Sequence, residues 1–204
     1  LGDVYKRQVV VNPLSDITVN EDSPDTTVIA YLDQVFGDID SELNYSYEIE
    51  DTLLFTVAAT NDTATLQLFA NANGISDIII TATNPTTRAT VSDTALVTVL
   101  PMNDVPEILS SLPDTSMMED DTLLMAIEVY DIDGDSLTVY GESDTSSVSI
   151  TYGGESIRIT TAANWNGSAG IAVIVMDDSS TSDTLSFTLT VDPANDPPLA
   201  AVLI

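Results

Sequence analysis

The sequence predicts an all-β fold, organised as two tandem β-sandwich modules. Three observations lead to this prediction. Apolar residues alternate with polar ones over many short runs, which is the period-two pattern of half-buried strands. Clusters of Asp, Asn, Gly and Ser separate these runs at turn-like spacing. A set of short sequence blocks also occurs twice in the same order, about 92 residues apart, which indicates an internal repeat.

The alternation is clearest in five runs. They are residues 65–69, 95–100, 123–130, 156–160 and 185–191. In the last run, Leu185, Phe187, Leu189 and Val191 share one face, with Ser and Thr on the other. Residues 77–83 and 170–176 are almost continuously apolar, as strands in the middle of a sheet can be. No run carries a convincing helical stripe.

Six pairs of blocks make up the repeat. "VNED" and "MMED" align Glu21 with Glu119 and Asp22 with Asp120. The other pairs are 36–43 with 129–137, 71–74 with 164–167, 81–84 with 174–177, 91–99 with 181–189, and "NDVP" at 103–106 with "NDPP" at 195–198. About seven short strands in each copy fit an immunoglobulin-like Greek-key sandwich.

The repeat also sets the expected domain boundaries. They are 9–102 for the first module, 103–104 for a linker, 105–193 for the second module, and 194–204 for a linker and the start of a further module. Proline in the linker motif restricts the backbone and should stiffen it. Residues 1–8 are excluded, because DNA encoding Asp3–Gln8 can match a transposase adapter used in sequencing libraries. We interpret them as a translated artefact, so the true N-terminus would be missing.

Composition excludes several classes of function. The chain has 33 acidic and 4 basic residues, a net charge of −29, so it should repel nucleic acid and anionic membranes and attract cations. It has no cysteine and no histidine, which removes disulfides, thiolate chemistry and the commonest general base. No apolar stretch reaches the length of a membrane-spanning helix. With 44% hydrophobic residues it is no disordered acidic tail, although the charge could simply be a solvated acidic surface.

The repeated polar motifs favour a calcium site. Glu-Asp, Asp-x-Asp and Asn-Asp-x-Pro are rich in oxygen and lie near turns. Calcium takes about six to eight oxygen ligands, which several short carboxylates, an amide and backbone carbonyls can supply together. Magnesium fits less well, because it keeps several of its waters. Each motif alone is also ordinary turn chemistry.

The ordered set of motifs resembles the cadherin-like repeats of bacterial surface proteins. The resemblance implies calcium at the joint between modules, with one or two ions per joint. At the joint within this chain it implies metal ligands from Glu21, Asp22, Asn103, Asp104, Asp131, Asp133 and Asp177, with Asp135 a weaker candidate. It implies Glu119, Asp120, Asn195 and Asp196 at a second joint, and Asp38 and Asp40 facing a preceding module.

The chain departs from animal cadherins at three places. Its linker motif is shorter, and Asn84 stands where an Asp is expected at the end of a strand, which should weaken the site above the first module. "NANG" at 71–74 and "NWNG" at 164–167 stand near where cadherins carry a later glutamate motif.

The resemblance implies a calcium-stiffened structural or adhesive repeat of a long extracellular, bacterial protein, and not an enzyme. Its expected partners are neighbouring repeats, other cell-surface proteins or polysaccharide, with no nucleic acid and no membrane-embedded segment. A polysaccharide- or ligand-binding accessory module is the alternative, and it requires exposed aromatic platforms on one sheet face. An enzyme domain is a third reading, which would require a deep pocket holding a buried carboxylate.

Overall fold

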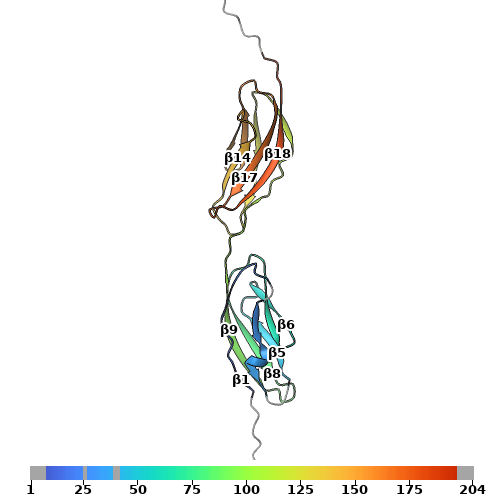
Figure 1. Ribbon diagram of the computed structural model, residues 1–204, viewed down its shortest axis with the longest axis vertical. Coiled ribbons are helices and arrows are strands. Elements are labelled where there is room, and N and C mark those ends of the chain that lie inside the picture. Colours follow the sequence, from blue (N-terminus) through green and yellow to red (C-terminus); the bar gives the residue numbers. More distant parts are fainter. Residues whose placement is uncertain (1–7, 25–26, 39–41, 197–204) are drawn as a thin grey trace, which may run out of the picture. The chain divides into compact units, whose positions relative to one another are not determined.

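The computed structural model describes residues 8–24, 27–38 and 42–196, and these are almost entirely β (Figure 1). The chain divides into two compact units, Leu1–Met102 and Asn103–Ile204, which we call module 1 and module 2. Among the described residues, the single helix is the short α1 (Leu32–Val35). The all-β prediction is therefore confirmed. Asp40 and nearly all of the suspected adapter lie outside the described residues.

Module 1 is a two-layer sandwich. Its strands are β1 (Val9–Val10), β2 (Ile17–Asn20), β3 (Val28–Tyr31), β4 (Phe36–Gly37), β5 (Asn44–Ile49), β6 (Phe55–Thr60), β7 (Thr63–Leu68), β8 (Gly74–Thr83) and β9 (Thr90–Leu100). One sheet has the order β2-β9-β8-β5, the other has the order β3-β7-β6, and β1 pairs with β4. β2 runs parallel to β9, whereas the other pairings are antiparallel.

Module 2 repeats this topology strand for strand. Its strands are β10 (Glu107–Ile108), β11 (Thr115–Met118), β12 (Thr122–Ala126), β13 (Val129–Tyr130), β14 (Thr138–Ser143), β15 (Val148–Tyr152), β16 (Ser156–Thr161), β17 (Gly167–Met176) and β18 (Ser182–Asp192). Its sheets have the orders β11-β18-β17-β14 and β12-β16-β15, and β10 pairs with β13. The predicted duplication of a sandwich module is thus confirmed.

The nine strands described in each module outnumber the expected seven because two strands are split, in module 2 the first into β10 and β11 and the second into β12 and β13. In module 2 the first strand pairs with β13 as β10, then crosses to the other sheet and pairs with β18 as β11. Pro113 lies between β10 and β11, and Pro13 lies between β1 and β2. Proline has no backbone N–H to donate to a neighbouring strand. It therefore interrupts strand pairing and suits the position where the chain passes from one sheet to another.

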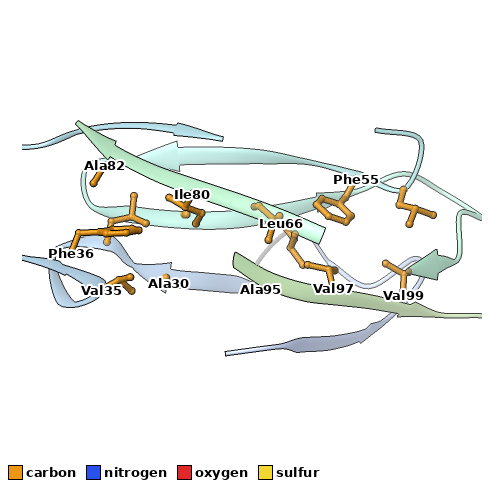
Figure 2. Close-up of a cluster of buried hydrophobic side chains, with 14 residues drawn as sticks. Ala30, Val35, Phe36, Phe55, Leu66, Ile80, Ala82, Ala95, Val97 and Val99 are labelled. Carbon is orange, nitrogen blue, oxygen red and sulfur yellow. The ribbon is translucent and has the colours of Figure 1, made fainter. Parts of the chain in front are cut away.

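The core of each module lies between its two sheets. Figure 2 shows the cluster in module 1, where Phe55 and Leu66 from one sheet meet Ile80 and Val97 from the other. In module 2, Phe187, Leu189 and Val191 are buried, as their alternation predicted. The core holds the two hairpins β8–β9 and β17–β18 in place. The loops of these hairpins contain Asn84 and Asp177.

Candidate metal centre

The loop after β13 is organised by Asp131. Its Oδ1 accepts hydrogen bonds from the backbone N–H groups of Asp133 at 2.9 Å and Asp135 at 3.2 Å. Gly134 has φ +78°, a left-handed conformation that glycine adopts without strain. Asp131 is only 7% exposed, and its Oδ2 is buried with no hydrogen-bond partner among the described residues.

A second carboxylate, Asp177, ends the apolar strand β17. Its Oδ1 accepts the N–H of Thr181 at 2.8 Å, and its Oδ2 accepts Asn103 Nδ2 at 2.9 Å and the hydroxyl of Thr181. Burial alone would raise the pKa of Asp177, but the hydrogen bonds from Asn103 and Thr181 outweigh it and lower that pKa. Asp177 is therefore held in its charged form.

The predicted linker residues join these two loops within module 2. Asn103 Nδ2 contacts both Asp177 Oδ2 and the carbonyl of Asp104, the latter at 2.8 Å. The N–H of Asp104 donates to Asp133 Oδ2 at 2.7 Å. The structure thus brings together five predicted site residues: Asn103, Asp104, Asp131, Asp133 and Asp177. We call them, with Asp135, the entry cluster.

The entry cluster concentrates negative charge. Burial, the charges of Asp178, Asp131 and Asp133, and a hydrogen bond with the Asp178 carboxyl together raise the pKa of Asp135. Asp178 and Thr181 were not predicted as site residues. Thr181 opens the block that aligns with module 1, and Asp178 directly follows a predicted ligand, so both were within reach of the sequence pattern.

The residues of the entry cluster fit a calcium ion in their chemistry. They offer carboxylate, amide and backbone carbonyl oxygens, the donors that Ca²⁺ prefers. The buried Asp131 Oδ2 calls for a hydrogen-bond donor or a cation, since an unsatisfied buried carboxylate oxygen is costly. Among the described residues, however, no three or more acidic side chains stand together at the spacing of metal ligands.

The equivalent end of module 1 has a different set of hydrogen bonds. Asp38 directly follows β4 as Asp131 follows β13, and Asn84 directly follows β8 as Asp177 follows β17. Asn84 Nδ2 donates to Asp38 Oδ2 at 2.8 Å. Asn84 Oδ1 accepts the N–H groups of Thr86 and Thr87, each at 2.9 Å. An amide therefore supplies the donor that Asp38 needs.

The predicted glutamates lie at the opposite end of each module. Glu21 and Glu119 are buried, at 2% and 5% exposure, and both accept hydrogen bonds from asparagine side chains. Asp22 and Asp120 each accept a backbone N–H at 3.0 Å, from Asn71 and Asn164.

Other predicted features have plain positions in the structure. Asn195 and Asp196 are exposed and follow β18. Trp165 is half-buried and packs against the core of module 2. The exposed large aromatics of the described residues are Tyr31, Phe69, Tyr130 and Tyr140, which are scattered over different sheets and loops instead of forming one platform. No helix in the described ranges is long and apolar enough to cross a membrane.

Residues 103–190 match the model of the family described as bacterial Ig domain. The chain resembles the solved structure of Drosophila N-cadherin EC1-4 with a TM-score of 0.54 and 16% identity, covering 88% of this chain and 48% of that one. It resembles protocadherin gamma B2 extracellular cadherin domains 1-5 with a TM-score of 0.53 and 17% identity, covering 93% of this chain and 40% of that one. Human CDH23 EC21-23 gives a TM-score of 0.51 and 16% identity, covering 86% of this chain and 66% of that one.

The chain spans less than half the length of the first two of these structures. No curated protein matches it. At these identities the structural likenesses establish the fold alone, and the family model adds a sequence similarity over residues 103–190. The chain is therefore a tandem of immunoglobulin-like β-sandwich repeats with the cadherin-like fold, and its second repeat is similar to a bacterial Ig domain.

Proposed function

We propose that module 2 binds calcium through the entry cluster, and that the ion stiffens the chain at Asn103–Asp104, where module 2 begins. The observation that carries this proposal is the buried Asp131 Oδ2, which has no hydrogen-bond partner among the described residues. A carboxylate oxygen in that position is stabilised by a cation. The hydrogen bonds of Asn103 and Asp104 with Asp177 and Asp133 connect this site to the linker.

The charge balance favours the same proposal. The ligand set supplies several carboxylates, and the described part of module 2 contains a single basic residue, Arg158, which lies on β16. Without a cation these carboxylates repel one another, so the loops they hold should loosen. Extracellular calcium modules typically bind with dissociation constants of about 10⁻⁴–10⁻³ M, so calcium outside a cell would fill such a site.

The wider role proposed is a structural or adhesive repeat of a long extracellular, bacterial protein. The fold and the match of residues 103–190 to the bacterial Ig domain model support it. The partners proposed are neighbouring repeats in the same chain and other cell-surface proteins or polysaccharide. The remaining predicted ligands, including Glu21, Asp22, Glu119 and Asp120, stay predictions of further calcium contacts.

The test is thermal unfolding of the full chain after treatment with chelator, followed by titration with calcium at fixed ionic strength. The expected result is a large rise in the melting temperature of module 2 at millimolar calcium. The rise should be lost in a D131A/D133A variant, and magnesium should give a smaller rise. An equal response to magnesium or to plain salt would overturn the proposal and indicate a solvated acidic surface.

A further inference from the structure

A buried glutamate controls the point where the chain leaves each module. β9 ends at Leu100, and Pro101 follows it. The backbone N–H of Glu21 donates to the carbonyl of Leu100 at 2.9 Å, and its side-chain Oε1 accepts the N–H of Met102 at 2.7 Å. Pro101 has no N–H to offer. Glu21 is therefore hydrogen-bonded to the residue before Pro101 and to the residue after it.

An asparagine completes this arrangement in module 1. Asn73 Nδ2 lies 3.2 Å from Glu21 Oε2 and 3.4 Å from Glu21 Oε1. Both oxygens of the buried carboxylate therefore have a donor, one from the departing backbone and one from the amide. With these hydrogen bonds, both oxygens of the buried carboxylate have a partner without a cation.

Module 2 contains the same set of contacts, residue for residue. The N–H of Glu119 donates to the carbonyl of Asp192 at 2.9 Å, Glu119 Oε1 accepts the N–H of Ala194 at 2.6 Å, and Asn166 Nδ2 donates to Glu119 Oε2 at 3.1 Å. Pro193 again lies between the two anchored residues. The geometry therefore recurs in both copies of the module.

We propose that Glu21 with Asn73, and Glu119 with Asn166, form metal-independent clasps that fix the chain as it leaves each module. The asparagines are positioning residues: each holds a carboxylate that in turn holds the departing backbone. The inference goes beyond calcium binding, because it assigns the exit of each module to neutral amide donors. Holding the exit of either module would then require no calcium.

The exposure of the two asparagines makes them suitable for substitution. Asn73 and Asn166 are exposed, whereas Glu21 and Glu119 are buried. Truncating an exposed asparagine leaves no cavity in the core. The substitution removes one hydrogen-bond donor from a buried carboxylate, so the stability contributed by that hydrogen bond is lost.

The direct measurement is amide hydrogen exchange by NMR on the full chain in chelator. In the unaltered chain, the N–H groups of Met102 and Ala194 should be protected without calcium. In N73A, exchange at Met102 should speed up by about tenfold, the size expected for one lost hydrogen bond, while Ala194 stays unchanged. N166A should give the reverse, so each module serves as the control for the other.

A third variant separates the amide from the cation. In N73D, a second carboxylate replaces the donor beside Glu21, so protection of Met102 should be lost in chelator and restored by calcium. The inference is overturned if the unaltered chain protects Met102 and Ala194 only after calcium is added, or if N73A and N166A leave both amides unchanged. The measurement in chelator does not depend on calcium at the entry cluster. The proposal of calcium binding can therefore be refuted while the clasps are confirmed, and the clasps can be refuted while calcium binding is confirmed.

Discussion

The entry ends of the two modules have the same strand arrangement but differ at one loop position, which is an amide in module 1 and a carboxylate in module 2. In module 1, Asn84 donates an amide hydrogen bond to Asp38 at 2.8 Å. In module 2, the position of Asn84 is taken by Asp177, which brings another carboxylate, and Asp131 Oδ2 is left without a partner among the described residues. The comparison teaches that an amide supplies in module 1 a donor that the corresponding carboxylate of module 2 lacks, so the proposed need for a cation depends on one loop residue and not on the sandwich.

The exit ends provide the contrast. There the two modules agree in the glutamate, the asparagine, the proline and the hydrogen bonds between them. The two modules therefore share the contacts at the exit and differ in the contacts at the entry. Four substitutions break or sharpen this comparison, given below in order of decreasing expected effect.

Replacing Asp177 by Asn should make the entry of module 2 resemble that of module 1. An amide at this position removes one carboxylate ligand and one repulsive charge, so the calcium-dependent stabilisation should disappear. At a calcium concentration of a hundred times the dissociation constant, that loss is about 2.7 kcal/mol. Chemical denaturation with and without calcium measures it. D121N, which removes the same charge from an exposed turn, should keep the full calcium response, and an unchanged response in D177N would refute the assignment.

The reverse substitution, N84D, should give module 1 a cation requirement. It removes the donor to Asp38 and places a carboxylate against it, which should destabilise module 1 in chelator by about 2 kcal/mol. Calcium should recover part of this loss. Denaturant unfolding in both conditions tests the prediction, with Q67E on the exposed face of β7 as the charge-matched control. A loss no larger than that of Q67E would show that the Asn84–Asp38 contact contributes nothing.

Gly141 tests whether the modules can be altered separately. A Cβ added there would clash with Ile150 Cγ2, so the side chain of Ile150 must shift. In module 1 the corresponding place in the sheet is held by Tyr47, which shows that the two modules fill this place differently. G141A should destabilise module 2 by about 1.5 kcal/mol and leave module 1 unaffected. Hydrogen exchange resolved by residue would report it, and an equal change in both modules would contradict it.

The smallest effect is expected at Tyr45 in module 1. Burial, then the charges of Asp62 and Asp33 and the neighbouring Tyr47, raise the pKa of Tyr45 from 10.0 to about 12. The folded state therefore holds the proton of Tyr45 more tightly than the unfolded state does. The contribution of this proton to the free energy of unfolding is complete below pH 10 and is lost as the pH rises from about 10 to about 12. In Y45F this loss should vanish from module 1. Unfolding curves between pH 9 and 12 would show it, and identical curves for the two chains would exclude it.

The strands were predictable because the period of two is a local property. The alternation at 185–191 placed Phe187, Leu189 and Val191 in the core correctly, and the apolar runs at 77–83 and 170–176 became the central strands β8 and β17. The ordered blocks predicted two modules of one fold. The splitting of the first strand escaped prediction, since pairing partners such as β10 with β13 and β11 with β18 are set by contacts across the whole module.

The sequence by itself determined the all-β class, the duplication, the acidic charge and the residue types suited to calcium, since these depend on neighbours along the chain. Only the tertiary structure decided which oxygens are satisfied. Asn73 reaches Glu21 across 52 positions, and Asn103 reaches Asp177 across 74. Hydrogen bonding between such distant residues depends on how the sheets bring their ends together. A motif therefore predicts a type of chemistry, and the fold decides whether an amide, a backbone N–H or a cation completes it.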